Sequence, residues 1–355
     1  MKTHSNSLAA EFEIENLLGL DLVRASEAAA LNTFKWIGKG DKNAADAAAT
    51  DAIRGMLNLM DMCGECTIGE GIKDEAPGIF LGEKLGTWRP GAPAVSIAVD
   101  PIDGTTLTSK GLPGAVSVIA AAETPSPEQR SLAAVPSVYM EKLAVGPRIK
   151  EGTGSIRMDA PVEQNLELIA LKLAKRVRDL VVCLLDRPRH AELIKEIRRT
   201  GASIRMIGDG DIAGAIAPSM PDSGVDVYMG IGGSPEAVLA AAAIKCLGGE
   251  ILARIWPRDD EERAALKQAG YDEARIAAVH DSEQMAKGDS IVFVATGITN
   301  SALLDGVRVD GTTARTHSVV MRSRSRTIRY VTTYHDLTRK TIHLHSEGGK
   351  RISDP

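Results

Sequence analysis

The sequence contains few aromatic residues and no long apolar runs. Phe, Trp and Tyr make up 3% of its 355 residues, so the core must be built from Ala, Val, Ile, Leu and Met. No stretch reaches the ~18 uninterrupted apolar residues that a membrane-spanning helix requires. The N-terminal residues also carry no long apolar segment behind their early lysine, unlike a secretory signal. We therefore expect a cytoplasmic protein that does not associate with a membrane.

The sequence also has no excess of basic residues. The chain has 42 Lys and Arg against 47 Asp and Glu, which gives a net charge of −5. Proteins that bind nucleic acid neutralise its phosphates with clustered Lys and Arg. We therefore expect no nucleic-acid partner. The apolar content of 44% and the charged content of 25% are ordinary for a globular protein.

The sequence has only four cysteines. Cys63 and Cys66 form a CGEC pair that could indicate a redox or zinc motif. A structural zinc site needs four ligands, and the sequence has no second closely spaced pair. Cys183 and Cys246 lie in apolar runs and are typical of buried small side chains. We therefore place the redox and zinc interpretations behind a structural one.

The pattern of apolar residues predicts an α/β fold. Helical periodicity predicts helices over residues 11–37 and 44–62. From residue 162 onward, short apolar runs alternate with amphipathic segments, which predicts a mostly parallel, doubly wound sheet with helices on both faces. The segment 288–347 returns to strands. We expect a boundary near 150–160, although the two parts could share one core.

Polar loops follow five of the predicted strands. Ligands bind outside the carboxyl ends of strands in parallel α/β sheets, so these loops predict one shared site. The loops are GEG (69–71), DPIDGTT (100–106), DRPRH (186–190), GDGD (208–211) and GGSPE (232–236). Two carboxylates ~4 Å apart, as Asp100 and Asp103 could be, repel by roughly 4 kcal/mol at an effective dielectric of 20. Something must compensate their charge.

Divalent cations are the compensation that the carboxylates suggest. Hard oxygen ligands suit Mg²⁺ or Mn²⁺ better than zinc or copper. The candidate ligands are Glu70, Asp100 and Asp103, with Asp46 and Glu236 as further candidates. Two or three such ions would neutralise the acids, clamp a phosphate and lower the pKa of a bound water. This machinery is what hydrolysis of phosphate monoesters needs, since the uncatalysed reaction is among the slowest known.

Other residues of these loops suit a sugar phosphate. Arg187 and Arg189 could hold a second phosphate, and Asp209 and Asp211 could accept hydrogen bonds from sugar hydroxyls. The alternative for the arginines is a solvated surface pair. A dinucleotide-binding reading of GIGGSPEA fails because Pro235 stands where the third glycine belongs.

Structural roles could also explain the acids. Asp100 and Asp103 could cap a helix, since Asp is favoured at that position. Asp46 lies in a predicted first helical turn, where an acid offsets the helix dipole. For Asp46, periodicity alone favours this structural role.

The motif DPIDGTT resembles the signature of the lithium-sensitive, metal-dependent phosphatase superfamily, which includes inositol monophosphatases and fructose-1,6-bisphosphatases. Further segments resemble the class II, bacterial type of fructose-1,6-bisphosphatase. They include KWIGKGDKNAAD, IGEGIKDEAPGIFLGEKLG, LDRPRHAELI and PDSGVDVYMGIGGSPEAV, and the resemblance spans residues 35–300. One departure is Ile72, which stands where many members have a glutamate.

The resemblance implies a fold and a set of site residues. The fold is a layered α-β-α-β-α sandwich of the sugar phosphatase type, with a metal-binding α+β region over 1–155 and a sugar-phosphate-binding α/β region over 156–355. The implied metal ligands are Asp46, Glu70, Asp100, Asp103 and Glu236, and the implied catalytic residues are Thr105 and Asp74. The implied substrate contacts are Asp103, Gly104, Thr105, Tyr139, Arg187, Pro188, Arg189, Asp209, Gly210, Asp211 and Gly233. Lys42 is a weaker candidate.

The implied activity is hydrolysis of the 1-phosphate of fructose 1,6-bisphosphate in gluconeogenesis. Fructose 6-phosphate and phosphate would form through attack by a water that Mn²⁺ or Mg²⁺ activates. The resemblance also suggests a homodimer or homotetramer. Sedoheptulose 1,7-bisphosphate or an inositol monophosphate is the alternative substrate. A sugar-phosphate-binding protein without activity is the alternative of another class.

Overall fold

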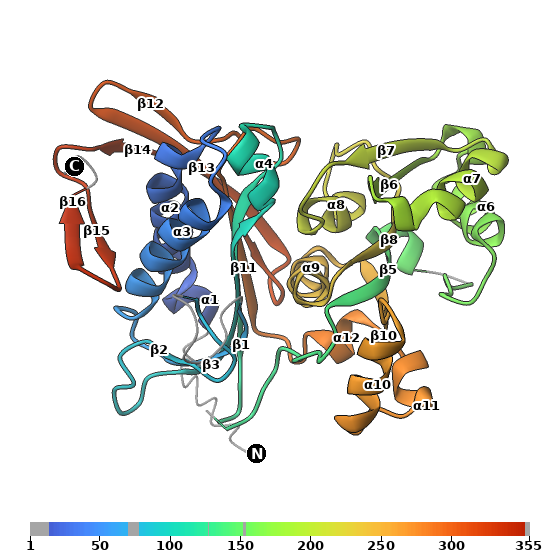
Figure 1. Ribbon diagram of the computed structural model, residues 1–355, viewed down its shortest axis with the longest axis horizontal. Coiled ribbons are helices and arrows are strands. Elements are labelled where there is room, and N and C mark those ends of the chain that lie inside the picture. The colour runs from blue at the N-terminus through green and yellow to red at the C-terminus, as the bar shows by residue number, and fades with distance from the viewer. Residues whose placement is uncertain (1–13, 70–77, 127, 152–153, 352–355) are drawn as a thin grey trace, which may run out of the picture.

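The computed structural model describes residues 14–69, 78–126, 128–151 and 154–351. These residues form an eight-stranded sheet, a six-stranded sheet and a small two-stranded sheet, with helices packed against the two large sheets (Figure 1). The α/β class predicted from the sequence is confirmed. The two-stranded sheet consists of β15 (Thr341–Leu344) and β16 (Gly348–Arg351).

The eight-stranded sheet is almost entirely antiparallel. Its strand order is β12-β13-β11-β4-β3-β1-β2, β14 pairs with β13, and only β1 and β3 run parallel. Its strands are β1 (Cys63–Ile68), β2 (Lys84–Leu85), β3 (Ala94–Asp103), β4 (Val116–Glu123), β11 (Ile291–Gly297), β12 (Arg308–Asp310), β13 (Thr313–Arg322) and β14 (Thr327–Asp336). The central strands β3, β4 and β11 are buried along nearly their whole length, which explains their continuous apolar sequences.

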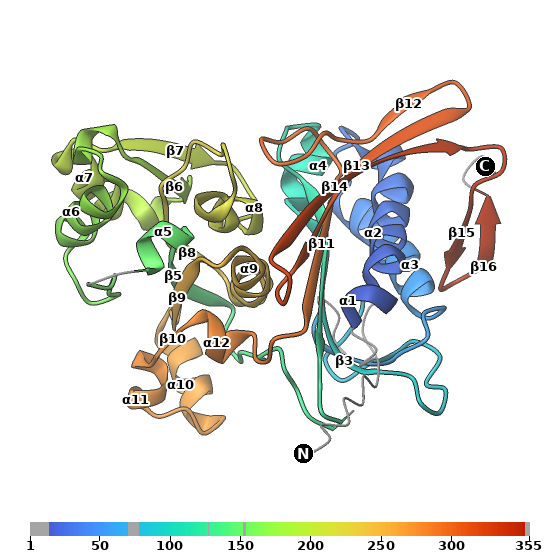
Figure 2. The same cartoon turned by 180° about the vertical axis from the view of Figure 1, so that it is seen from behind.

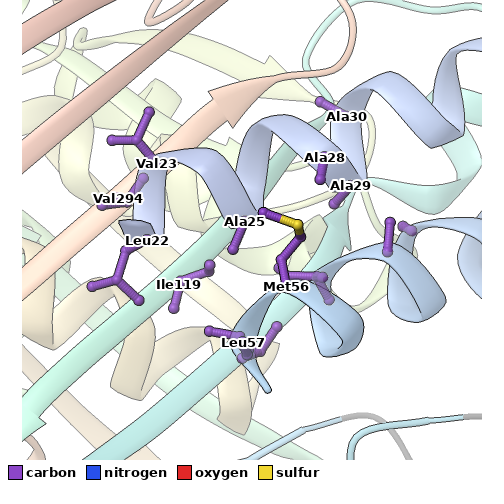
Figure 3. Packing of buried hydrophobic residues seen from close by; sticks show 14 of the residues in the cluster. Leu22, Val23, Ala25, Ala28, Ala29, Ala30, Met56, Leu57, Ile119 and Val294 are labelled. Carbon is purple, nitrogen blue, oxygen red and sulfur yellow. The ribbon is translucent and has the colours of Figure 1, made fainter. Parts of the chain in front are cut away.

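Helices α2 (Gly19–Thr33) and α3 (Lys42–Leu57) cover one face of this sheet, preceded by the short α1 (Ile14–Leu17). Figure 3 shows the alanines of α2 packed beside Met56 and Leu57 of α3 and Ile119 of the sheet. Small side chains let the two helices approach closely, so this core needs no aromatic residues. Helix α2 ends at Thr33 instead of residue 37, and α3 begins at Lys42 and ends at Leu57 instead of spanning residues 44–62. Asp41 caps the start of α3 by accepting a hydrogen bond from the Ala44 amide.

The six-stranded sheet is mixed. Its strand order is β10-β9-β5-β8-β6-β7, and β6 runs parallel to β7 and β8. Its strands are β5 (Tyr139–Val145), β6 (Val181–Leu185), β7 (Ser203–Ile207), β8 (Val227–Gly233), β9 (Glu250–Ile255) and β10 (Val279–His280).

The mostly parallel sheet predicted from the sequence is therefore correct only for β6, β7 and β8. Strand β5 is antiparallel to β8 and β9, and β10 is antiparallel to β9. The strand–helix alternation did indicate the parallel unit. It could not reveal that β5, which precedes this alternation in the chain, is inserted between β8 and β9 in the opposite direction.

Helices pack on both faces of the mixed sheet (Figure 2). Helices α8 (Ile212–Ile216) and α9 (Ser234–Leu247) lie between the two large sheets, and α6 (Val162–Leu173) and α7 (Ala191–Thr200) cover the outer face. The buried alanines of α9 let both sheets pack closely around it. The remaining helices are α4 (Thr105–Lys110), α5 (Pro147–Lys150), α10 (Asp260–Gln268), α11 (Glu273–Ala277) and α12 (Ser282–Met285). No helix in the described part of the chain has the length and apolar character needed to cross a bilayer.

The sheets divide the chain differently from the predicted boundary between residues 155 and 156. Strand β5 precedes that boundary and belongs to the six-stranded sheet. Strands β11 to β14 follow it and return to the eight-stranded sheet. The sequence signal near this boundary reflects the start of the strand–helix alternation, which does not coincide with a division between the sheets.

The cysteines have the structural character expected of them. Cys63 and Cys66 stand three residues apart on β1, so they point to opposite faces of the strand. All four cysteines are free thiols. Burial raises the pKa of Cys66 to about 12, and the negative charge of Glu83 is the second cause of this increase. A thiol with so high a pKa is a poor nucleophile and a poor metal ligand.

Candidate metal and phosphate site

An irregularity at the end of β3 brings Asp100 and Asp103 to the same place. Side chains three residues apart on a regular strand point to opposite faces. The pairing of β3 with β4 shifts register between Asp100 and Asp103, and such shifts commonly redirect a side chain. The Ile102 amide donates a 3.0 Å hydrogen bond to Asp100 Oδ1 within this turn. The motif therefore places two carboxylates at one strand end.

Glu236 completes an acidic group of three. It lies in the first turn of α9, directly after β8. Carboxylate oxygens of Asp100, Asp103 and Glu236 lie within 4.8 Å of one another, and this is the acidic group that could hold a metal ion among the described residues. The structure thus brings together three of the five predicted ligands, from β3 in one sheet and from α9 between the sheets.

The electrostatics of this group favour a bound cation. Burial raises the pKa of Asp103 well above its usual range, and the negative charges of Asp211 and Glu236 raise it further. Burial also raises the pKa of Glu236, and the negative charge of Asp211 raises it as well. The donor set consists entirely of carboxylate oxygens, which is the chemistry that Mg²⁺ and Mn²⁺ prefer. The residues present therefore fit a hard divalent cation.

Two predicted site residues, Glu70 and Asp74, lie outside the described residues, as does Ile72. Asp46 lies on α3, one helical turn after Lys42, whose Nζ donates a 2.8 Å hydrogen bond to Thr106 Oγ1 of α4. Residues four apart on a helix share one face. Asp46 thus shares a helix face with Lys42, although the acidic group of three does not include it.

Thr105 begins α4 immediately after Gly104. Gly104 has a φ of 98°, a left-handed conformation that glycine adopts readily. Thr105 Oγ1 lies 3.2 Å from the carbonyl oxygen of Ile102, to which it donates a hydrogen bond. The turn therefore places the Thr105 hydroxyl two residues beyond Asp103 and on the same loop.

The predicted substrate residues gather around a pocket of about 330 Å³ beside Glu236. The predicted residues that line it are Tyr139, Arg187, Arg189, Asp209, Gly210, Asp211 and Gly233. They come from the ends of β6, β7 and β8 and the start of β5. Pro188 is an exposed residue between the two arginines, and Asp103, Gly104 and Thr105 belong to the neighbouring β3–α4 turn.

Both arginines are held in place by the protein. Arg187 pairs with Asp209 at 2.6 Å and also donates to the Gly208 carbonyl. Arg189 donates two hydrogen bonds to the Ile231 carbonyl, and its guanidinium stacks on the Tyr139 ring at 4.8 Å. These contacts orient the guanidinium groups at the pocket, which a solvated surface pair would not require.

The two aspartates of the GDGD loop differ sharply in environment. Asp209 accepts hydrogen bonds from the Thr106 amide at 3.0 Å and from Arg187, so it joins α4 to the arginine loop. Asp211 is buried, and its oxygens bind Lys142 at 2.7 and 2.9 Å and the Tyr228 hydroxyl at 2.7 Å.

Lys142 is a residue that the sequence reasoning missed. It lies on the inward-facing row of β5 between two apolar residues, Met140 and Ala144. A lysine in the apolar row of a buried strand is unusual, and this was the signal available in the sequence. His190 was missed as well. Its Nε2 accepts from the Ile231 amide and its Nδ1 donates to the Leu185 carbonyl, so it braces the loop that carries the arginines.

An oxygen-only acidic group next to an arginine-lined pocket is a candidate site for a divalent cation and a phosphorylated ligand. The comparisons agree with this class of protein. The sequence model of the family described as bacterial fructose-1,6-bisphosphatase, glpX-encoded, matches residues 16–335, and the chain belongs to this family.

Curated relatives match over nearly their whole length. A fructose-1,6-bisphosphatase class 2 of Haemophilus influenzae is 46% identical over 330 residues, which cover 90% of this chain and 96% of the relative. A D-fructose 1,6-bisphosphatase class 2/sedoheptulose 1,7-bisphosphatase of Synechococcus sp. (strain JA-3-3Ab) is 39% identical over 344 residues, which cover 91% of this chain and 96% of the relative.

Proposed function

We propose that this protein hydrolyses fructose 1,6-bisphosphate at its 1-phosphate, releasing fructose 6-phosphate and inorganic phosphate. The observation that carries the proposal is the position of Glu236, which belongs both to the acidic group of three and to the lining of the arginine pocket. One phosphate could then lie at the acids while the second lies at the arginines. The family to which the chain belongs supports this substrate.

Each group has a role in this proposal. Asp46, Glu70, Asp100, Asp103 and Glu236 would hold Mn²⁺ or Mg²⁺. When bound, such ions neutralise the acids and lower the pKa of a coordinated water. The Thr105 hydroxyl would orient the attacking water or contact the 1-phosphate, and Asp74 would support this step.

The pocket residues would bind the rest of the substrate. Arg187 and Arg189 would bind the second phosphate as charge-assisted hydrogen-bond donors, with Tyr139 supporting Arg189. Asp209, Gly210 and Gly233 would contact the sugar through side chain or backbone. Asp211 lines the same pocket, although its carboxylate already binds Lys142 and Tyr228.

We also infer the finer features that the family resemblance implies. These are the α-β-α-β-α layering of sugar phosphatases, a metal-binding region over 1–155 and a sugar-phosphate-binding region over 156–355. The two regions differ from the division between the sheets, and Glu236 of the second region would serve as a metal ligand. A role in gluconeogenesis in the cytoplasm and a homodimeric or homotetrameric assembly belong to the same inference.

Phosphate release from the purified protein tests the proposal. Incubation with fructose 1,6-bisphosphate and Mn²⁺ or Mg²⁺ should release phosphate, and EDTA should stop the release. Absence of release across a range of metals and pH values would overturn the proposal. Tight sugar-phosphate binding without turnover would instead support a non-catalytic binding protein.

Sedoheptulose 1,7-bisphosphate is a second candidate substrate. It is favoured by the Synechococcus relatives, whose names include both bisphosphates and which are 39% identical to this chain. Measuring kcat/KM for both bisphosphates and for an inositol monophosphate would rank the candidates. A higher kcat/KM for sedoheptulose 1,7-bisphosphate would show that it, and not fructose 1,6-bisphosphate, is the main substrate.

A further inference from the structure

Lys142 is a charged residue in the interior of the protein. Its side chain has an exposed fraction of 0%, and its neighbours on the same face of β5 are Met140 and Ala144. Taking an ammonium group out of water is strongly unfavourable unless a partner compensates its charge. A lysine is therefore retained at such a position only with a specific partner.

That partner is Asp211, at the start of α8. Both carboxylate oxygens of Asp211 accept hydrogen bonds from Lys142 Nζ, and one of them also accepts from the Tyr228 hydroxyl. Asp211 and Tyr228 are as deeply buried as Lys142. Gly232 of β8 belongs to the same arrangement, because a Cβ at that position would collide with the Asp211 carboxylate. The network therefore joins β5, β8 and α8 around one carboxylate.

Asp211 lies close to the acidic group. The amide of the next residue, Ile212, donates a 3.1 Å hydrogen bond to Asp103 Oδ2. The charge of Asp211 also contributes to raising the pKa of Asp103, whereas Lys142 lowers it. Asp211 is nevertheless outside the group whose oxygens lie within 4.8 Å of one another.

We propose that Lys142 is a positioning residue that holds the Asp211 carboxylate out of the metal site, so that a bound cation meets only the intended acids. Asp211 carries the same carboxylate group as the neighbouring candidate ligands Asp100 and Asp103, but both of its oxygens are bound by Lys142 and one is also bound by Tyr228. The affinity of a site for a hard divalent cation depends on the number of charged ligands. Lys142 thereby limits how tightly the cation is bound. This inference rests on the metal-dependent activity proposed above.

Titration of the EDTA-treated full chain with MnCl₂ by isothermal calorimetry tests the inference. Lys142→Met keeps the length of the side chain and removes its charge, so Mn²⁺ should bind about tenfold more tightly as Asp211 becomes available. Asp211→Asn leaves Lys142 without its counter-charge, so Mn²⁺ should bind about tenfold more weakly. The double variant K142M/D211N removes both charges and should bind Mn²⁺ within about twofold of the wild-type protein.

Further variants guard against a failure of Lys142→Met to fold. Tyr228→Phe removes one hydrogen bond from Asp211 and should tighten Mn²⁺ binding about two- to threefold. Lys175→Met is a matched control, because Lys175 pairs with the nearly buried Asp226 in the same half of the molecule, and it should leave Mn²⁺ binding unchanged. Thermal melting followed by circular dichroism verifies the fold of each variant.

Two results would overturn the inference. One is unchanged or weaker Mn²⁺ binding in folded Lys142→Met or Tyr228→Phe. The other is K142M/D211N binding Mn²⁺ as tightly as Lys142→Met, because Asp211 would then not be the added ligand. Absence of Mn²⁺ binding by the wild-type protein would instead count against the proposed function.

Discussion

The amide of Ile212 donates a hydrogen bond to the carboxylate of Asp103, although the two residues stand 109 positions apart in the chain. Asp103 ends a strand of the eight-stranded sheet, and Ile212 begins a helix that lies between the two large sheets. Asp209, two residues before the buried Asp211, accepts a hydrogen bond from the Thr106 amide in the same region. The candidate site is therefore assembled by contacts between distant parts of the chain.

Replacing Asp103 should remove activity without removing the fold. Asp103→Asn keeps the shape of the side chain and an oxygen that can accept from the Ile212 amide, but it loses the charge that a cation needs. Substitution of residues that only support a metal ligand lowers metal affinity or activity by about 10–100-fold. Loss of the ligand itself should therefore lower kcat/KM by more than about 100-fold. Phosphate release and circular dichroism measure the two effects. An active variant would contradict the role of Asp103 in metal binding.

Thr105→Ala should lower kcat far more than it changes KM. A hydroxyl that orients an attacking water acts in the transition state, and positioned proton-transfer groups contribute about 10²–10⁴-fold. We expect kcat to fall about 100-fold while KM changes less than about threefold, with Thr105→Ser as the control that retains the hydroxyl. An increase in KM at unchanged kcat would show that Thr105 only binds substrate.

Arg187→Ala should discriminate between substrates with one and two phosphates. Hydrogen bonds to charged groups contribute about 1.5–3 kcal/mol, which corresponds to a loss of roughly 10–100-fold in kcat/KM for the bisphosphate. A monophosphate should be affected much less. The substitution also removes the cationic partner of Asp209, although Asp209 keeps its hydrogen bond from the Thr106 amide. The double variant R187A/D209N therefore controls for the uncompensated charge of Asp209. Equal losses for both substrates would contradict a role of Arg187 at the second phosphate.

The stability of the metal-free protein should depend on pH through the acidic group. The pKa values of Asp103 and Glu236 are raised above their usual 3.8 and 4.5, so both carboxyl groups stay protonated in the folded protein at pH values where they ionise in the unfolded chain. Their contribution to stability is fully present below about pH 4 and is lost as the pH rises through the raised values. The melting temperature of the wild-type protein in EDTA should therefore fall relative to that of Asp103→Asn as the pH increases.

Addition of Mn²⁺ should reverse this loss. Ligand at 100 times its dissociation constant stabilises a protein by about 2.7 kcal/mol, and competition with protons weakens this effect at low pH. The increase in melting temperature caused by Mn²⁺ should thus be greater at pH 8 than at pH 5. If the difference in melting temperature between the wild-type protein and Asp103→Asn did not change with pH, the assignment of these carboxyl groups would be contradicted.

Local sequence patterns predicted the elements that carry the acids. The apolar run before Asp100 indicated a buried strand, and the structure has β3 there, while Glu236 was placed at the start of a helix, which is α9. Residues of three of the other loops, DRPRH, GDGD and GGSPE, line one pocket, as expected, whereas Glu70 and Gly71 of the GEG loop lie outside the described residues. Such features depend on residues that are neighbours in the chain, which is why the sequence reveals them.

Strand direction and buried pairing could not be predicted in the same way. The residue pattern of β5 is the same whether the strand is parallel or antiparallel to β8, so the direction of the strand had no local signal. The sequence likewise gave no reason to pair Lys142 with Asp211, because the two residues meet only after β5 and α8 have packed. Both features depend on tertiary contacts.

The return of β11 to β4 has a consequence for the order of folding during synthesis. All strands of the six-stranded sheet lie between residues 139 and 280, whereas the eight-stranded sheet needs β11 to cover the edge of β4. During synthesis on the ribosome, residues 139–280 can complete the hydrogen bonds of the six-stranded sheet while β4 of the eight-stranded sheet still has an unpaired edge. We therefore expect nascent chains that stop before residue 291 to aggregate, since an unpaired buried strand recruits other chains.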